Sequence, residues 1–436
     1  MTGLRIVDGR VIDPASGVDE ITDLFLAEGR VAGLGTAPRG FRENQVIDAA
    51  DCVVCPGLVD LRGRCREPGL EHKGTIASET RAAAAAGITT LCVPPDTEPV
   101  IDSAAVAALI RRRAERAGHA RLVPLGALTR GLAGNALSEM SALKEAGCAG
   151  VSNDCYPVEN LLVLRRALEY AATFDLTVHL LPQEHALANE GCAHEGAVST
   201  RLGLPGIPAA AETVAVAACL ALVEETGVRA HFALLSTRRA AQMVARARHD
   251  GLPVSAAVSA HHLHLTELDL LDFDSQCHVL PPLRTQRDRD GLRHWLARGD
   301  IAAVCSDHQP HEADAKLAPF SATASGISAL ETLLPLTLRL VDEGVLGLTE
   351  AIARLTSEPA RILGLDRDGT AGSLAPGAVA DVCIFQPEAY WTLGGEALLS
   401  QGHNTPFLNW EMKGRVRYTL LGGRVVHALE EADLRS

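Results

Sequence analysis

Lysine is scarce in this chain, which has only four. Acidic residues outnumber basic ones, so the 436 residues carry a formal net charge of -14 at pH 7. A chain this acidic is not expected to bind nucleic acid or an anionic membrane through its charge. No apolar run approaches the length of a membrane span, and the first residues, MTGLRIVDGR, lack the apolar core of a secretory signal. We therefore expect a cytoplasmic protein with neither nucleic acid nor membrane as a partner.

Several motifs that carry chemistry are also missing. The sequence has no glycine-rich phosphate loop, no nucleophile elbow and no deaminase motif. Eleven cysteines are present, and in a chain of this kind they indicate buried thiols, not disulfides. Cys52 and Cys55 form a CxxC motif, but their odd separation places them on opposite faces of a strand. This disfavours a redox or zinc role for the pair.

Length and composition predict a soluble protein with one large and one smaller domain. The chain is 47% hydrophobic and 22% charged, which is ordinary for globular proteins. Short alternating strands with Asp-Gly and Glu-Gly corners fill the first fifty or so residues, and the C-terminal part repeats this texture. We predict a composite β-sandwich domain from residues 1–55 and 366–436, with a barrel domain at residues 56–365 inserted between its halves.

The middle of the chain alternates strands with helices. Apolar, β-branched runs occur at 53–59, 88–93, 121–127, 148–152, 176–181, 228–234, 253–258 and 301–306. Helical patterns separate them, and glycines stand where helix C-caps belong, at Gly87, Gly118, Gly147, Gly227 and Gly251. Eight such units predict an α/β fold of the (β/α)8 TIM barrel type, with any active site at the C-terminal ends of the strands.

The motifs along the chain resemble those of the dihydroorotase family, in the cyclic amidohydrolase superfamily. They are PGLVDL, REPG at 66–69, HKGTIASETRAAAAAGITT, PPDTEPVID, VSNDCYPVEN, EGAVSTRLGLPGIP, PPLRT, SDHQPH and SEPARILGL. The resemblance implies a barrel with a composite β-sandwich. It also implies one or two zinc ions that activate water to open or close a cyclic amide, interconverting dihydroorotate and carbamoyl aspartate.

The positions that would hold this zinc have changed. The His-x-His pair expected after the first strand is Arg62 and Arg64, and the histidine positions after strands five and six are Leu181 and Leu234. After strand four, where the family has a bridging group, the turn keeps Asp154 and no lysine is near; Asp307 remains after strand eight. Zinc binding of roughly 10–16 kcal/mol over four ligands is about 3 kcal/mol per ligand, so losing four histidines removes useful affinity. We predict no zinc cofactor, no catalytic residues, and remnant ligand positions at Asp307 and possibly Asp154.

The remaining polar positions form a remnant pocket. We expect Arg62 to pair with Asp307 or Asp154 in the vacated metal volume; the alternative is that both arginines extend into solvent. Arg66 matches the family residue that holds the substrate carboxylate, but its asparagine partner is Asp96, which repels an anion, and a second expected asparagine is Leu280. His308 could contact a carboxylate or make a structural hydrogen bond within its loop.

Other histidines and a cysteine offer alternatives. We expect His179 to be a core residue on the inward face of its strand, and His231 to face the helices. His261, His262 and His264 follow strand seven, but the family uses that loop for substrate backbone contacts, so a metal site there is disfavoured. Cys65 could offer a thiolate, because the neighbouring arginines would lower its pKa.

Within the family, the closest resemblance is to the non-catalytic dihydroorotase-like subunit that assembles with aspartate carbamoyltransferase in pseudomonad-type bacteria. It rests on VIDPASG, LVDL without histidines before REPG, KGTIASETRAA, LEYAATFDLTV, VRAHF and HQPHExDAKLAPF. The resemblance implies a pseudoenzyme, aspartate carbamoyltransferase catalytic chains as partners, and a role in pyrimidine biosynthesis. A homodimer within the larger complex is expected from the symmetry of soluble oligomers.

Two alternatives remain open from the sequence. One is an active amidohydrolase with an altered or metal-free site, built from Arg64, Arg66, Asp154, Asp307, His179 and His308. The other is a barrel that binds a nucleotide precursor as a regulatory ligand, with Arg62, Arg64 and Arg66 as an anion sink.

Overall fold

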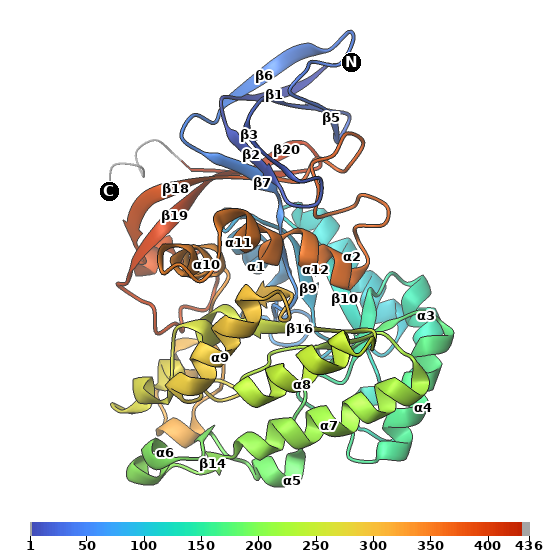
Figure 1. Cartoon of the computed structure of the whole chain (residues 1–436), viewed down its shortest axis with the longest axis vertical. Helices are drawn as coiled ribbons and strands as arrows, with labels where there is room; N and C mark the ends of the chain where they lie inside the picture. The colour runs from blue at the N-terminus through green and yellow to red at the C-terminus, as the bar shows by residue number, and fades with distance from the viewer. Residues whose placement is uncertain (1, 430–436) are drawn as a thin grey trace.

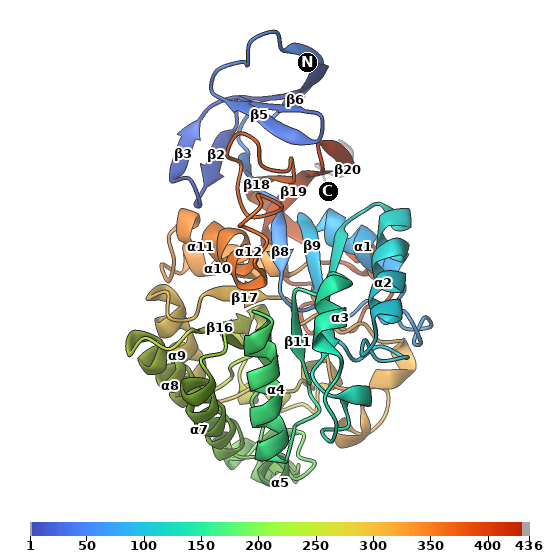
Figure 2. The ribbon, with the colours of Figure 1, turned by 90° about the vertical axis from the view of Figure 1, so that its right-hand side faces the viewer.

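The computed structural model describes residues 2–429, and it places a small β domain against one end of a barrel (Figures 1 and 2). Ten strands form two sheets in the small domain, with the orders β5-β4-β1-β6 and β20-β19-β18-β7-β2-β3. They are β1 Thr2–Val7, β2 Arg10–Asp13, β3 Val18–Ile21, β4 Leu24–Ala27, β5 Arg30–Leu34, β6 Arg42–Asp48, β7 Val53–Pro56, β18 Val382–Thr392, β19 Glu411–Leu421 and β20 Arg424–Ala428.

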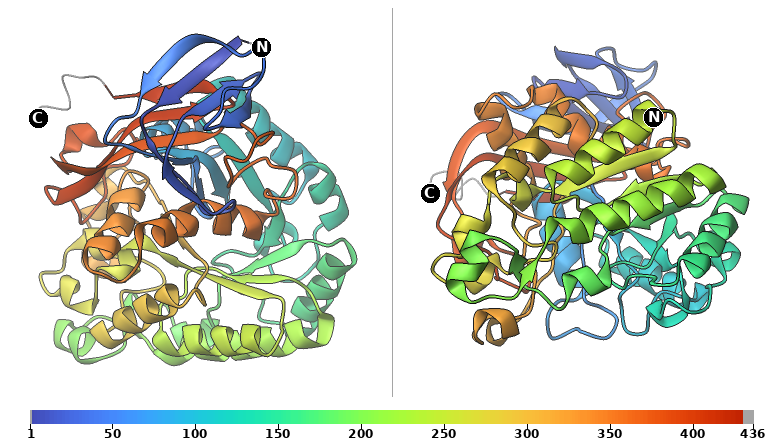
Figure 3. Two further views of the ribbon diagram at one scale, coloured as in Figure 1. Left: turned by 45° about the horizontal axis from the view of Figure 1, so that its top comes forward. Right: turned by 60° about the horizontal axis from the view of Figure 1, so that its bottom comes forward.

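Strand β7 joins the two ends of the chain. It pairs in parallel with β2, where Arg10 lies opposite Val53, and antiparallel with β18, where Val382 lies opposite Pro56. The N-terminal and C-terminal strands therefore lie side by side (Figure 3, left). Apolar residues from both segments, including Leu24, Val54 and Ile384, share a buried core between the sheets.

Eight parallel strands form the barrel, in the order β17-β16-β15-β12-β11-β10-β9-β8. An isolated parallel bridge between Gly63 and His308 connects the two outer strands beyond their ends. The strands are β8 Leu58–Asp60, β9 Ile88–Val93, β10 Arg121–Ala127, β11 Gly150–Ser152, β12 Thr177–Leu180, β15 Ala230–Phe232, β16 Val254–Ser259 and β17 Ala303–Cys305. This nearly closed parallel sheet confirms the predicted TIM-barrel fold class.

Helices cover the outside of the barrel, and capping residues fix their ends. In α8, Thr237 accepts a hydrogen bond from the Ala240 backbone N–H, as an N-cap does. The five glycines predicted at helix ends all have positive φ, which a glycine adopts without a Cβ clash. The helices are α1 Ile76–Ala85, α2 Ala104–Ala117, α3 Met140–Glu145, α4 Leu161–Thr173, α7 Ala209–Thr226, α8 Arg238–His249, α9 Gln286–Ala297, α10 Leu333–Asp342, α11 Leu348–Leu355 and α12 Ser357–Leu363.

An excursion between β12 and α7 lies at the C-terminal ends of the strands, which we call the mouth of the barrel. Figure 3, right, turns this end of the molecule toward the viewer. The excursion contains α5 His185–Ala188, β13 Ala193–His194, α6 Ala197–Leu202 and β14 Gly206–Ile207. In the described part of the chain, no helix has both the length and the apolar character needed to cross a membrane.

The first predicted strand, 53–59, is in fact two strands, so this prediction was wrong. The chain leaves the sandwich at Pro56 and enters the barrel at Leu58. At Gly57 a Cβ would lie 2.2 Å from the Thr89 hydroxyl oxygen, so only glycine lets the backbone pass β9 this closely. One buried apolar cluster includes Ile12 and Phe385 of the small domain together with barrel residues. The domain limits at 55–56 and 365–366 stay predictions, and residues 430–436 of the C-terminal range lie outside the described part.

Candidate functional site

The backbone after the first barrel strand is fixed by a buried carboxylate. Asp60 accepts hydrogen bonds from the Ser306 backbone N–H at 3.0 Å and from the Arg62 backbone N–H at 3.3 Å, and the Ser306 hydroxyl also donates to it. Burial raises the pKa of Asp60 to about 6, although the Ser306 hydrogen bonds oppose this. These contacts link the ends of β8 and β17 and fix the backbone from which the arginines extend into the mouth.

Arg62 lies between two carboxylates from distant parts of the chain. Its Nε donates to Asp307 Oδ1 at 2.8 Å, and its Nη1 donates to Asp154 Oδ1. The side chain is only 7% exposed. Both expected partners are therefore engaged at once, and the alternative in which the side chain extends into solvent is excluded.

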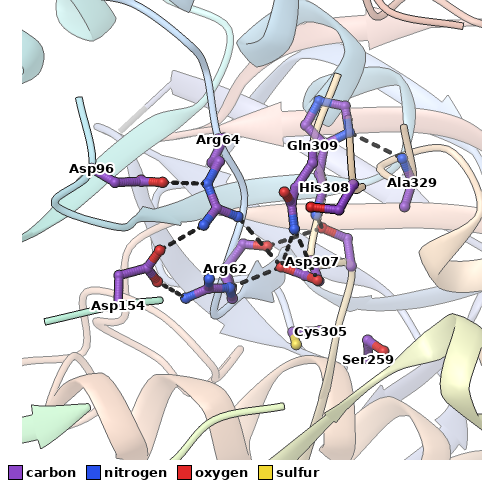
Figure 4. Close-up of polar contacts among 12 residues, drawn as sticks. Arg62, Arg64, Asp96, Asp154, Ser259, Cys305, Asp307, His308, Gln309 and Ala329 are labelled. Carbon is purple, nitrogen blue, oxygen red and sulfur yellow. Dashed lines mark hydrogen bonds and ion pairs between the residues drawn. The ribbon is translucent and has the colours of Figure 1, made fainter. Parts of the chain in front are cut away.

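Arg64 adds a third carboxylate to the same network. Its Nε donates to Asp96 Oδ2 at 2.7 Å and its Nη2 to Asp154 Oδ2 at 2.6 Å, while its Nη1 lies 3.6 Å from Asp307 Oδ1. Gln309 donates to both oxygens of Asp307 at 3.2 Å. We call Arg62, Arg64, Asp96, Asp154 and Asp307 the mouth network; Figure 4 shows its members converging.

Arg62, Arg64 and Asp154 stay charged despite their burial. Burial alone would raise the pKa of Asp154, but the guanidinium groups of Arg62 and Arg64 outweigh it and hold that pKa well below its usual range. For both arginines, burial lowers the pKa, and the carboxylates reverse this and raise it above its ordinary value. Opposite charges at hydrogen-bond distance therefore compensate each other's desolvation.

Arg66 points to a different partner. Its Nε donates to the Pro310 carbonyl at 3.0 Å, and its Nη2 lies 3.0 Å from His311 Nε2. Burial, and after it the charge of Arg64, lower the pKa of Arg66 to about 10. The residue that resembles a substrate clamp is therefore tied to the loop after strand eight.

His308 is held by a carboxylate that sequence reasoning missed. Its Nδ1 accepts the Ala329 backbone N–H at 3.0 Å, which leaves the ring proton on Nε2, 2.8 Å from Glu79 Oε2. Glu79 is fully buried on α1 and also accepts from the Ser400 hydroxyl at 2.6 Å. A charged residue on the apolar face of a predicted helix was the signal that could have revealed it.

The histidine pair inside the barrel corrects one prediction. His179 is buried and inward, as expected, and burial lowers its pKa to about 4. His231 was predicted to face the helices, but it lies opposite His179 in the β12–β15 register, with ring centroids 5.2 Å apart. Alternation counted from Leu234 fails because β15 ends at Phe232 and Leu234 has a φ of 51°.

The cysteine alternatives fail as well. Cys65 is fully buried, and burial raises its pKa well above the ordinary value, with Glu79 and Glu67 adding to the effect. The prediction of a thiolate favoured by the arginines is therefore wrong. Cys52 and Cys55 are free and buried.

Histidines after strand seven make structural contacts. His262 Nδ1 lies 2.6 Å and His261 Nε2 3.1 Å from the Ser259 hydroxyl, and His264 Nε2 lies 2.8 Å from the Leu336 carbonyl. Leu234 is buried in an apolar cluster with Leu181 packed against it. The strand-five and strand-six positions therefore offer apolar side chains to the mouth.

The residues at the mouth do not fit a zinc ion. Among the described residues, Asp96, Asp154 and Cys155 bring three potential ligand atoms within 4.8 Å of one another. Two of these groups, however, already bind Arg64, and a guanidinium cannot act as a ligand. Each unit of positive charge about 4 Å from a guanidinium costs on the order of 4 kcal/mol at an effective dielectric of 20. The donor set that zinc requires is absent from these positions.

The backbone of the mouth nevertheless keeps an unusual geometry. Arg66, Asp154, Leu234 and Asp307 all have φ between 48° and 60°. Non-glycine residues in this region cost about 1–3 kcal/mol each and gather at functional sites. These four residues therefore fix an unusual backbone geometry at the mouth.

Comparison with known proteins places the fold among amidohydrolase barrels. The chain superposes on the L-hydantoinase (dihydropyrimidinase) from Arthrobacter aurescens with a TM-score of 0.87 and 21% identity, covering 99% of this chain and 98% of that one. Residues 51–240 match the family described as Dihydro-orotase-like, and residues 317–427 match the one described as Amidohydrolase family.

Proteins with similar sequences identify the family within these amidohydrolase barrels. The chain is 51% identical to the dihydroorotase-like protein of Pseudomonas putida, over 98% of this chain and all of that protein. It is 50% identical to the dihydroorotase-like protein of Pseudomonas aeruginosa over 97% of this chain and 99% of that protein. The dihydroorotase of Syntrophotalea carbinolica is 43% identical over 98% of this chain and 100% of that protein. The chain belongs to the dihydroorotase family.

Proposed function

We propose that this protein is a catalytically inactive member of its family that serves as a structural subunit of aspartate carbamoyltransferase in pyrimidine biosynthesis. The observation that carries the inactive state is the mouth network. Its two arginines bind the carboxylates that could otherwise hold metal, with Arg62 Nε 2.8 Å from Asp307 and Arg64 Nη2 2.6 Å from Asp154. Without a metal, hydrolysis of a cyclic amide needs another means of activating water.

Three groups near the mouth that could act as a general base, Asp154, Asp307 and His308, are all engaged by other groups. The Asp154 and Asp307 carboxylates are held by arginines, and the His308 imidazole is held between Glu79 and the Ala329 backbone. A base must lie within hydrogen-bond reach of the water that it activates and be free to take its proton. The carboxylates and the arginines instead neutralise one another, which supports a role for the mouth network in stabilising the fold.

The assembly role rests on similarity to the Pseudomonas proteins, which are named dihydroorotase-like and align along nearly their whole length. In this proposal, the barrel serves to bind partners through its surface. It forms a homodimer within a larger complex with the transferase chains. A separate active dihydroorotase must then exist in the same cell.

The first test is metal content and turnover together. Protein purified from zinc-supplemented medium is analysed by mass spectrometry and assayed for dihydroorotate hydrolysis, with the Syntrophotalea carbinolica dihydroorotase as a matched control. We expect far less than one zinc per chain and no turnover. Stoichiometric zinc with turnover would refute the inactive state.

The partnership has its own test. The protein is mixed with the aspartate carbamoyltransferase chain of the same organism and analysed by size-exclusion chromatography with light scattering. We expect one complex larger than either component, and transferase activity that depends on it. Separate elution at all ratios would contradict the proposed assembly while leaving the inactive state untouched.

The second candidate is an active amidohydrolase with an altered site. It is favoured by the 43% identity to proteins named dihydroorotase. Its pocket would use Arg64, Arg66, Asp154, Asp307, His179 and His308. The test is a cell in which this chain is the sole dihydroorotase. Growth of that cell without added pyrimidines would show that the chain is an active enzyme.

A further inference from the structure

A cavity lies at the base of the barrel, at the end opposite the mouth. Its volume is about 460 Å³, and β12, β15 and β16 begin in its wall. Part of its surface is apolar and contributed by Leu176, Leu252, Pro253, Val254, Ile362 and Leu363. Small-molecule sites in proteins occupy about 300–1,000 Å³ and combine apolar surface with a few polar groups.

The other lining residues are strongly cationic. They include Lys144, Arg229, Arg248, Arg361 and Arg367, against the one carboxylate of Asp175. These side chains leave an excess of four positive charges around one cavity, in a chain whose formal net charge is -14. We call these five cations the base cluster.

Few carboxylates neutralise the base cluster. Asp175 is shared, because Arg229 forms an ion pair with it and Arg367 Nη1 lies 3.6 Å from its other oxygen. Arg361 pairs with Glu358. Among residues 2–429, Lys144 and Arg248 form no ion pair with a carboxylate, although the charge of Lys144 also acts on Asp175 and lowers its pKa.

Two residues of the base cluster bind backbone carbonyls near helix C-termini. This explains their positions but does not neutralise their charges. Lys144 Nζ donates to the Phe174 carbonyl at 2.6 Å, and Arg248 Nη1 donates to the Gly299 carbonyl at 2.7 Å. Cations at helix C-termini are stabilised by the last carbonyls. A carbonyl does not cancel a unit charge, so these contacts hold the cations in place for another anion.

A further arginine adds positive charge near the base cluster. Arg354 lies beside the cluster, and its Nε is buried without a hydrogen-bond partner. Burial lowers the pKa of Arg354; Glu358 and Glu350 oppose this, while the charges of Arg248 and Arg361 add to the lowering. A bound anion would relieve this repulsion.

We propose that the base cavity binds a small anion that carries a polyphosphate chain. Guanidinium groups bind phosphate oxygens through paired hydrogen bonds, and lysine adds a point charge. The apolar part of the cavity suits a nucleobase, so a nucleoside triphosphate uses both surfaces. Arg62 and Arg64 at the mouth have no such spare charge, because Asp154, Asp307 and Asp96 already bind them.

The test is isothermal titration calorimetry of the full chain at low salt, with inorganic tripolyphosphate and with ATP as probes. Both are expected to bind saturably. Lys144→Ala and Arg367→Ala should each weaken binding about tenfold, the loss of one charge-assisted hydrogen bond. Both side chains are exposed, so neither substitution should disturb folding.

Two matched controls locate the site. Arg246→Ala removes an arginine that is 84% exposed on the same helix as Arg248 but does not line the cavity, and it should leave the affinity unchanged. Arg66→Ala tests the mouth and should also have no effect.

The proposal is overturned if neither probe binds saturably, if Arg246→Ala weakens binding as much as Lys144→Ala, or if Arg66→Ala alone abolishes it. Tighter binding of ATP than of tripolyphosphate would support the site and identify a nucleotide as its ligand. Equal binding would support it with the polyphosphate chain as the recognised part.

Discussion

At the scale of single residues, two buried arginines set the electrostatics of the mouth. A histidine there would help carboxylates to hold a cation, whereas Arg62 and Arg64 are themselves the cations. Asp154 receives both, at Oδ1 and Oδ2 respectively. The carboxylates that remain are thus needed for stability, because removing one partner from a buried pair leaves an uncompensated charge.

Asp154→Asn should lower the free energy of unfolding at pH 7 by about 3–5 kcal/mol, because it leaves two buried guanidinium groups underpaired. The folded-state pKa of Asp154 lies below its unfolded value, so its stabilisation is complete above about pH 4 and is lost as the pH falls through the folded pKa. Urea unfolding at several pH values should show the difference from wild type shrinking below about pH 4.

The control for this prediction is Asp250→Asn. Asp250 is 57% exposed and lies 3.6 Å from Arg246, so its removal should cost less than about 0.5 kcal/mol. Equal effects of the two substitutions would mean that the mouth network contributes no more than a surface pair.

His179→Leu should reduce the acid sensitivity of the fold. The pKa of His179 is lowered to about 4 from its ordinary value of 6.5, first by burial and then by Arg62. The unfolded chain therefore takes up a proton that the folded chain refuses, and stability is lost as the pH falls from about 6.5 to about 4, by roughly 3 kcal/mol.

The leucine variant should lack this part of the pH dependence in denaturant unfolding. His179 Nε2 has no hydrogen-bond partner, so the substitution leaves no partner atom unsatisfied there. Substitution of exposed His249 by glutamine is the matched control. An unchanged slope in His179→Leu would show that His179 does not set the acid limit.

At the scale of elements, a buried carboxylate on α1 connects three segments that are far apart in the sequence. Glu79 accepts from His308 after β17, from the Ser400 hydroxyl and from the Gln401 backbone N–H. Burial alone would raise the pKa of Glu79, but these donors hold it below its ordinary value. The loop after strand eight is therefore positioned by α1 and by the segment that follows β18.

Glu79→Gln should cost about 2–3 kcal/mol, because the amide presents a donor where an acceptor is required and leaves buried donors unpaired. Hydrogen exchange should show faster exchange at the Gln401 and Ala329 amides. Glu115→Gln on the exposed face of α2 provides the matched control. Protection unchanged at both amides would contradict the connecting role.

At the scale of the whole molecule, the two domains share structure. Strand β7 leads directly into β8 through Gly57, and one apolar cluster includes Ile12, Phe385 and Val416 together with barrel residues. Because this cluster includes residues of both parts, independent unfolding of either part would expose apolar surface on the other.

Calorimetry should therefore show one unfolding transition for the chain. Phe385→Ala, in the small domain, should lower the midpoint of that single transition and cost about 3–5 kcal/mol. Two resolved peaks, with only one moved by the substitution, would show that the small domain unfolds by itself.

The sequence predicted the main architecture because the relevant signals are local. Alternation and helical periodicity lie within ten or twenty residues, and the glycine C-caps mark helix ends directly. These signals failed where the backbone departs from regular geometry. The split at Gly57 and the early end of β15 at Phe232 are both such departures, and the second reversed the predicted side of His231.

The sequence by itself determined the barrel and its family, since each depends on residue identity at a fixed place in a local pattern. It also places Arg62, Arg64, Leu181 and Leu234 where the family resemblance leads us to expect metal-binding histidines. Only the tertiary structure decided that Arg62 bridges Asp154 and Asp307, which are 92 and 245 residues away, and that Glu79 holds His308 across 229 residues. It also decided that cations from separate helices meet at the base. Such contacts depend on how the strands and helices pack in three dimensions. A pattern that spans only ten or twenty residues cannot predict that packing.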